Sequence, residues 1–99
     1  MAYRIAYSPA ALVHPRSLTK PQQGATLDGV AAQLTDQPGI ETRNRKPMRP
    51  NPVAPWELRL GDLRVYYETE HSPAAVVTIL AVDIKIRNVV FIGNEAIEL

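Results

Sequence analysis

The pattern that most restricts the folds open to this chain lies in residues 56–68. Two runs of alternating residues, Trp-Glu-Leu-Arg-Leu and Leu-Arg-Val-Tyr-Tyr-Glu, are separated by Gly61 and Asp62. Alternation is typical of a half-buried strand, and a two-residue connection that contains glycine favours a tight hairpin turn. The sequence therefore predicts a β-hairpin and, around it, an antiparallel sheet.

The short turn also predicts the register of the hairpin. Its five cross-strand pairs are Leu60–Leu63, Arg59–Arg64, Leu58–Val65, Glu57–Tyr66 and Trp56–Tyr67. Because side chains alternate between the faces of a strand, one face collects apolar residues for the core. That face holds Trp56, Leu58, Leu60, Leu63, Val65 and Tyr67, and the other holds Glu57, Arg59, Arg64 and Tyr66.

The polar face places two arginines opposite each other. Two such charges repel by roughly 1 kcal/mol at about 5 Å in water, so folding alone does not require the pair. A phosphate between them makes the arrangement favourable, since guanidinium groups bind phosphate oxygens in a bidentate manner. The alternative is that Glu57, Asp62 or Glu68 neutralises each arginine on a solvated face.

The remaining elements follow from periodicity and from proline and glycine positions. Ser8-Pro9 is typical of a helix start, Pro15 limits that helix, and Gly24 and Gly29 weaken the next one. The expected elements are a strand over 2–7, a short helix from 9, a helix over 22–35, a proline-rich ordered or extended loop over 40–55, a central strand over 75–82 and a last strand over 89–92 followed by an acidic tail.

Composition narrows the class of protein. With 99 residues, 45% of them hydrophobic and 21% charged, the chain fits a single domain spanning 1–99. It has no cysteine, which excludes thiol and cysteine-ligated metal chemistry, and its two isolated histidines form no metal motif. We expect no cofactor. A strand pattern at the first residues and the lack of a long apolar run predict a cytoplasmic protein with no membrane partner.

The net charge of +1 conceals a strongly basic middle. Residues 43–64 contain six basic and two acidic side chains, whereas residues 65–99 contain two basic and five acidic ones. Such a block on a nearly neutral chain favours a local anion site or a solvated loop. For nucleic-acid contact the candidates are Arg43, Arg45, Lys46 and Arg49, with Tyr66 from the arginine face.

Three segments resemble the RelE/ParE superfamily of bacterial toxins, and RelE-like members most. They are Tyr-Arg-Ile-Ala-Tyr-Ser-Pro-Ala-Ala near the start, the hairpin, and the ending from Asp83-Ile-Lys-Ile-Arg-Asn to Phe-Ile-Gly-Asn-Glu. The resemblance implies an α+β fold with two N-terminal helices packed on a mostly antiparallel sheet, and a cognate antitoxin as partner. RelE-like members cleave mRNA on the ribosome, whereas ParE-like members inhibit DNA gyrase.

The resemblance also assigns roles to particular positions. Arg59 and Arg64 match catalytic or RNA-binding residues, and Lys85 and Arg87 lie in the basic stretch where a further functional arginine is found. Two positions depart from the family pattern, because Glu57 stands where lysine is usual and Phe91 stands near the usual C-terminal tyrosine.

RNA cleavage requires a base for the 2′-hydroxyl, stabilisation of the phosphate charge and an acid for the leaving oxygen. Arginine supplies the second function and is a poor base. Glu57 could accept a proton weakly, and Lys46 or Lys85 could do so if desolvated. The leading hypothesis is a ribosome-dependent mRNA endoribonuclease that inhibits translation. The alternatives are a non-enzymatic gyrase inhibitor and an attenuated toxin that acts as an antitoxin-binding module.

Overall fold

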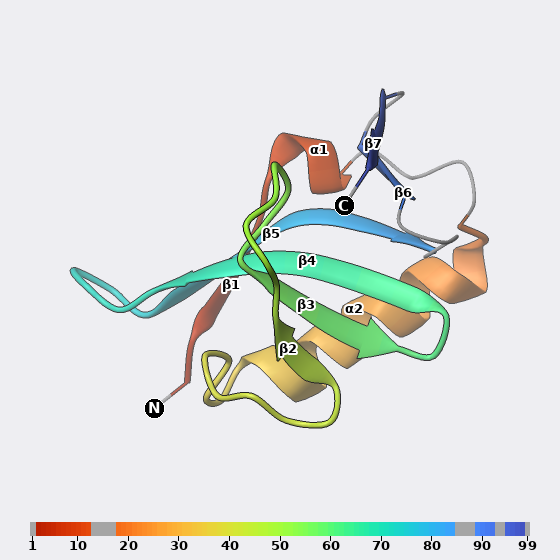
Figure 1. The fold of residues 1–99 in the computed structure, drawn as a ribbon. Coiled ribbons are helices and arrows are strands. Elements are labelled where there is room, and N and C mark those ends of the chain that lie inside the picture. Colours follow the sequence, from red (N-terminus) through yellow and green to blue (C-terminus); the bar gives the residue numbers. More distant parts are fainter. Residues whose placement is uncertain (1, 13–17, 85–88, 93–94, 99) are drawn as a thin grey trace.

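The computed structural model describes residues 2–12, 18–84, 89–92 and 95–98, with the side chains of residues 2–9, 11 and 18–82. Figure 1 shows one long helix lying along a curved sheet. The elements in chain order are β1 (Arg4–Tyr7), α1 (Pro9–Leu12), α2 (Lys20–Leu34), β2 (Arg45–Pro47), β3 (Trp56–Leu60), β4 (Leu63–Glu70), β5 (Val76–Ile84), β6 (Val89–Ile92) and β7 (Glu95–Glu98).

Five strands form the main sheet, in the order β1-β5-β4-β3-β2. The strands β2, β3, β4 and β5 pair antiparallel, and β1 joins the sheet parallel to β5. The expectation of a mostly antiparallel sheet in an α+β fold is therefore confirmed. A separate two-stranded sheet pairs β6 with β7. The segment expected as an acidic tail is thus partly a strand, which corrects that prediction.

The hairpin has the register that the sequence predicts. All five pairs form, from Leu60 opposite Leu63 to Trp56 opposite Tyr67. Gly61 takes a φ of +61°, which a two-residue turn of type II′ needs at its first position. A residue with a Cβ is strained in that conformation, so the glycine fixes the turn and the turn fixes the faces.

The helical part differs in extent from the expectation of two packed helices. The first helix is a single described turn, α1, and residues 13–17 after it lie outside the described residues. The helix α2 begins at Lys20 because Thr19 and Gln22 form a reciprocal capping box and Pro21 occupies the first turn. It ends at Leu34, one residue before the predicted end.

One glycine in α2 has a packing role. A Cβ at Gly29 would clash with the side chain of Leu60, whereas a Cβ at Gly24 would meet nothing within 4 Å. The helix therefore approaches β3 closely at Gly29. The absence of a Cβ permits that approach and lowers the intrinsic stability of the helix at this position.

The main core lies between α2 and the sheet. It is built from Val30 and Leu34 of the helix with sheet residues Leu58, Val65, Tyr67, Val77, Ile79 and Val82. Trp56 stacks on Tyr67 at its margin, with ring centroids 6.1 Å apart. The apolar face of the hairpin is thus the core face, as the alternation predicts.

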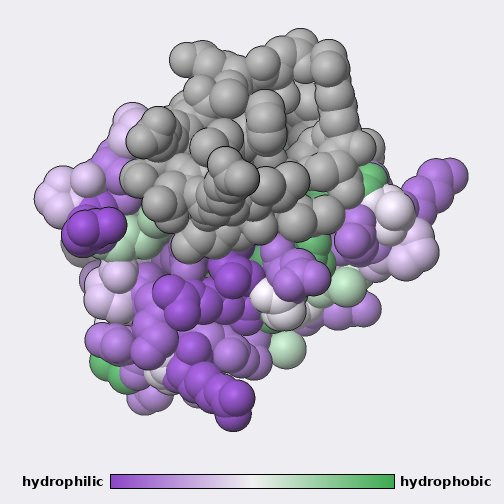
Figure 2. Space-filling model, turned by 45° about the vertical axis from the view of Figure 1, so that its right-hand side comes forward, coloured by the Kyte–Doolittle hydropathy of each residue, from purple (hydrophilic) through white to green (hydrophobic). Residues whose placement is uncertain are grey.

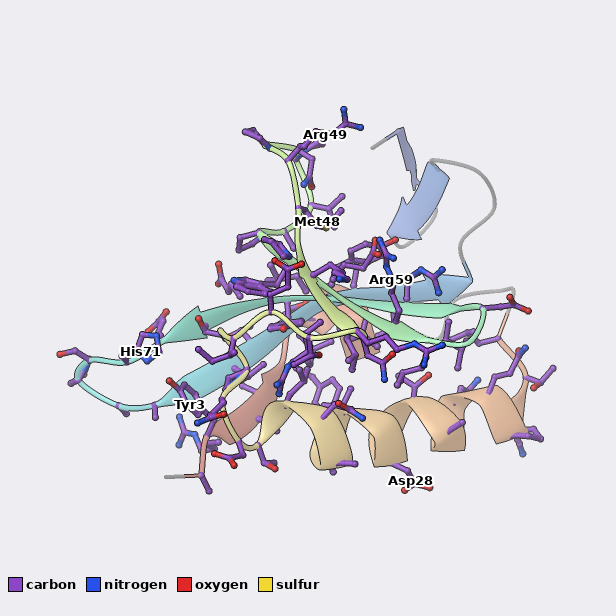
Figure 3. All side chains as sticks on the ribbon, turned by 60° about the horizontal axis from the view of Figure 1, so that its bottom comes forward. Tyr3, Asp28, Met48, Arg49, Arg59 and His71 are labelled. Carbon is purple, nitrogen blue, oxygen red and sulfur yellow. The ribbon has the colours of Figure 1, made fainter. Side chains whose placement is uncertain are left out.

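The opposite face of the sheet is partly covered rather than fully solvated. Residues 48–55, hereafter the arm, lie over it and form a second cluster in which Ala54, Tyr66 and Ala81 are buried. Figures 1 and 3 show the arm on the side of the sheet away from α2. The predicted ordered or extended loop also contains the short edge strand β2, which the sequence analysis did not assign. Pro47 is tolerated there because an edge strand has a free side.

A bulge in β5 helps the arm to pack. The register of β4 and β5 shifts between Tyr66 and Tyr67, which leaves Leu80 as an extra residue. Leu80 and Ala81 consequently both pack on the arm side. The carbonyl of Leu80 accepts a hydrogen bond from the Ser8 hydroxyl at 3.2 Å, so the irregular strand remains bonded.

Candidate nucleic-acid interface

The two opposed arginines share one buried carboxylate. Arg59 Nε donates to Glu57 Oε1 at 2.6 Å, and Arg64 Nε lies 3.8 Å from the same oxygen. The Glu57 side chain is 4% exposed, against 47% for Arg59 and 18% for Arg64. We call Glu57, Arg59 and Arg64 the arginine cluster. Its two cations against one anion leave an excess positive charge.

Arg64 is held by its own turn. Its Nη1 donates to the carbonyls of Gly61 and Leu63 at 2.5 and 2.9 Å. Its buried Nε makes no hydrogen bond, because the Glu57 oxygen at 3.8 Å is too distant for one. Arg64 therefore offers fewer N–H donors to a ligand than Arg59 does.

Arg59 is the accessible member of the cluster. Within the described residues, its only side-chain hydrogen bond goes from Nε to Glu57, which leaves both terminal nitrogens available. Figure 3 shows Arg59 on the same side of the sheet as Met48 and Arg49 of the arm, opposite α2. The arginine cluster and the arm therefore belong to one surface.

The adjacent cations Arg45 and Lys46 lie on opposite faces of β2. Arg45 Nη1 donates to the carbonyls of Gln33 and Asp36 at 2.8 and 3.0 Å, where it binds the C-terminal end of α2. A cation at that end also interacts favourably with the helix dipole. Lys46 instead stands opposite Glu57 in the sheet and forms an ion pair with Glu41 at 3.2 Å. Arg45, a candidate for RNA contact, thus has a structural role.

The other candidates from the sequence divide by exposure. Arg43 and Arg49 are exposed, and Arg49 is carried by the arm. Tyr66 is fully buried under the arm, so its ring is not available for stacking on a base in this structure. Lys85 and Arg87 lie outside the described residues, as does the side chain of Phe91.

Asn51 organises the arm, and the sequence analysis missed it. Its Oδ1 accepts hydrogen bonds from the backbone of Val53 and Ala54 at 2.8 and 3.1 Å. Its Nδ2 donates to the carbonyls of Arg49 and Ala54 at 2.6 and 3.0 Å. An asparagine among prolines is a known turn former, so the Asn-Pro pair was the signal that could have found it.

A hollow of about 440 Å³ lies between the arm and the sheet. The sheet contributes Glu68 of β4 and Leu80 of β5, and the arm contributes the remaining lining residues. Figure 2 shows another side of the molecule, on which the described surface is mostly hydrophilic. Within residues 2–12 and 18–82, no group of three His, Asp or Glu side chains could hold a metal ion. No described helix combines the length and hydrophobicity of a membrane span.

The comparisons with known proteins bear on the fold. No protein-family model and no curated protein matches this chain. A chain in the crystal structure of the toxin–antitoxin complex RelBE2 from Mycobacterium tuberculosis is similar, with a TM-score of 0.64 and 24% identity. The match covers 86% of this chain and 100% of that chain. It shows a shared fold and confirms, for the fold, the RelE-like resemblance of the sequence.

Proposed function

We propose that this protein is the toxin of a toxin–antitoxin pair and cleaves mRNA on the ribosome. The observation that carries the proposal is the arginine cluster, in which Arg59 and Arg64 are cross-strand neighbours and both lie within 4 Å of the buried Glu57 carboxylate. The fold shared with a chain of a toxin–antitoxin complex supports the same class of protein. The cognate antitoxin, the ribosome and mRNA are the proposed partners, and the cytoplasm is the proposed location.

The cluster suits the charge-stabilising part of RNA cleavage. Arg59 offers its terminal nitrogens to a scissile phosphate, and these donors stabilise the negative charge that develops during attack by the 2′-hydroxyl. Glu57 restricts the rotamers of Arg59 through the 2.6 Å hydrogen bond, so less side-chain entropy is lost when the phosphate binds.

Glu57 is not placed to act as the general base. Its carboxylate is buried beneath the two guanidinium groups it binds, away from an incoming hydroxyl. Lys46, the cross-strand partner of Glu57, is a described alternative, although Glu41 pairs with it. Orientation of the mRNA by the ribosome supplies much of the acceleration in this proposal and reduces the demand on side chains.

The direct test uses purified protein and ribosomes programmed with a defined mRNA. Cleavage by Arg59→Ala/Arg64→Ala is expected to fall by about 100-fold or more, because donors to the developing charge are removed. Arg4→Ala is the matched control, since it removes an exposed arginine on β1, at the other edge of the sheet from β2 and β3. Thermal unfolding of each variant checks the fold. Undiminished cutting by the double variant would refute the site.

A second candidate function follows from the carboxylate itself. Glu57 neutralises one of the two arginines, which favours an attenuated toxin that mainly binds its antitoxin. The variant Glu57→Gln separates the two readings. An active nuclease loses cleavage because Arg59 is less well oriented, whereas an attenuated one gains RNA affinity because an anion is removed. A supercoiling assay on the same preparation tests gyrase inhibition, which predicts loss of supercoiling with no RNA product.

A further inference from the structure

The sulfur of Met48 lies at the base of the arm. The chain contains two methionines and no cysteine, so Met1 and Met48 carry its only sulfur atoms. Met1 lies outside the described residues. Figure 3 shows Met48 where the arm leaves β2, on the side of the sheet away from α2. Within the part of the chain that the structure describes, chemistry at sulfur is therefore confined to Met48.

The Met48 side chain packs the arm against the sheet and is also reached by solvent. Met48 and Val53 are the partly buried arm residues that pack on the cluster of Ala54, Tyr66 and Ala81. Met48 also lines the hollow, which is open to solvent. The same thioether thus contributes to packing and is accessible to a small solute such as a peroxide.

The arm is held on the sheet by few contacts. Of residues 48–55, only Ala54 is fully buried. The four hydrogen bonds of Asn51 go to the backbone of the arm itself. Met48 N donates to the carbonyl of Pro55 at 2.8 Å, which is also a bond within the arm. These bonds shape the arm without attaching it to β4 or β5, so its described contacts with those strands are mainly the apolar ones of the cluster.

We propose that Met48 is an oxidation site and that its sulfoxide releases the arm from the sheet. Hydrogen peroxide transfers one oxygen atom to Sδ: the O–O bond breaks, an S–O bond forms, the sulfur is oxidised by two electrons and water leaves. The product is a polar side chain among the apolar neighbours Val53, Ala54 and Leu80. Burial of the new oxygen without a hydrogen-bond donor is unfavourable. The oxidised side chain therefore turns to solvent, and the arm loses one of its apolar contacts.

Release of the arm changes the face that carries the arginine cluster. It uncovers Tyr66, which is fully buried while the arm is in place. It also frees the backbone of Arg49, the exposed cation of the arm. The consequence for activity rests on the proposed action on RNA: oxidation is expected to lower cleavage, because that face no longer has one fixed arrangement. The change is reversible, since methionine sulfoxide reductases return the sulfoxide to the thioether with a thiol as reductant.

The experiment treats the folded protein with hydrogen peroxide and locates the added oxygen by mass spectrometry, with a denatured sample as the reference for an accessible methionine. Met48 is expected to be oxidised in both samples. Nitration by tetranitromethane then reports on the cover of Tyr66, with Tyr67, buried on the helix side, as internal control. Oxidation is expected to speed nitration of Tyr66 by about tenfold or more and to leave Tyr67 unchanged.

Two results of that experiment overturn the proposal. One is a Met48 that stays reduced in the folded protein while the denatured sample is fully oxidised, because the sulfur is then inaccessible. The other is a Tyr66 that remains equally protected after Met48 has been oxidised, because the arm then tolerates the sulfoxide in place.

Two variants of Met48 assign the effect to its sulfur. Met48→Leu keeps an apolar side chain of similar volume and cannot be oxidised, so peroxide is expected to leave its Tyr66 nitration unchanged. Met48→Gln places a polar group at the same position and is expected to expose Tyr66 without peroxide. A peroxide effect that persists in Met48→Leu overturns the proposal, since another residue is then responsible.

A cleavage assay separates the oxidation site from its consequence for activity. After removal of peroxide with catalase, cleavage of ribosome-bound mRNA is expected to fall in wild type and not in Met48→Leu. Treatment with a methionine sulfoxide reductase is expected to restore it. Nitration does not depend on RNA, so an exposed Tyr66 supports the oxidation site even if cleavage is never observed. Equal cleavage by the oxidised and reduced protein, with Tyr66 exposed, overturns the regulatory role.

Discussion

The two faces of the main sheet differ in composition, although neighbouring residues of the same strands supply both faces. The face toward α2 is apolar and continuous, and alternate positions of β3 and β4 fill it with buried side chains. The other face carries a buried carboxylate, two arginines and a proline-rich cover. The first face supplies the stability of the fold, and the second retains polar groups that the fold does not require. This difference is the reason that the proposed function is assigned to the second face.

The largest expected difference between the faces comes from adjacent residues of β3. Leu58→Ala opens a cavity in the main core and is expected to lower the free energy of unfolding by about 2–5 kcal/mol. Glu57→Gln is expected to lower the free energy of unfolding by only about 1–2 kcal/mol, because water can still solvate Arg59 and Arg64 after the carboxylate is removed. Urea denaturation of both variants measures the two values. Equal losses would mean that the polar face is also a main source of stability.

The next comparison uses the adjacent cations of β2. Arg45→Ala removes two hydrogen bonds to the end of α2 and a favourable charge at its C-terminus, with an expected loss of about 2 kcal/mol. Lys46→Ala removes an exposed ion pair and is expected to cost less than about 0.5 kcal/mol. Thermal unfolding distinguishes them. A larger loss in the lysine variant would reverse the assignment of the two faces.

Alkaline pH tests the helix-side face through Tyr67. Burial raises the pKa of Tyr67 above its ordinary value of 10.0, and the charge of Arg45 opposes this change. Above about pH 10 the unfolded chain therefore ionises at this position while the folded chain does not. The free energy of unfolding is expected to fall by up to about 1.4 kcal/mol per pH unit from this residue.

The variant Tyr67→Phe isolates that contribution. It loses the hydrogen bond from Tyr67 to the carbonyl of Pro38, so it is less stable near neutral pH. Its stability is expected to fall less steeply than that of wild type between pH 10 and 11 in urea titrations. Parallel curves would show that Tyr67 does not govern the alkaline loss. Burial also raises the pKa of Tyr7, which remains in both proteins.

The smallest expected effect separates the two glycines of α2. Gly24→Ala is expected to stabilise the protein by about 1 kcal/mol, since an open site gains helix propensity. Gly29→Ala gains the same propensity but displaces Leu60, so we expect no net gain. Guanidinium denaturation compares the two variants. A stabilised Gly29→Ala would show that helix and sheet are not tightly packed at this point.

The sequence predicted the helix-side face well because that face depends on local rules. Alternation and the Gly61-Asp62 turn were enough to fix the register of β3 and β4. The covered face depends on long-range packing. Nothing local indicates that Tyr66 is buried by residues 48–55, or that Leu80 forms a bulge against them. Residues 45–47 were predicted as part of an ordered or extended loop, because local rules do not show that this segment lies at a sheet edge, where Pro47 is acceptable.

The candidate site was predictable in composition but not in detail. Opposed arginines followed from register, and their proximity to Glu57 followed from the shared face. The sequence could not show that Glu57 lies close to both arginines, that Arg45 turns toward α2 or that Glu68 lines a hollow. These features depend on side-chain geometry. Two adjacent basic residues look alike in a sequence, and only the pleat of β2 assigns them to different faces.

The parallel pairing of β1 with β5 has a consequence for the order of folding. Residue Arg4 meets Val76, so this contact closes a loop of roughly seventy residues, whereas β3 and β4 meet across two. Loop-closure entropy makes the distant contact slow to form until the intervening chain is ordered. We therefore expect the hairpin to form before β1 docks on β5. Because β1 pairs only with β5 in the main sheet, it cannot join that sheet before β5 has been synthesised.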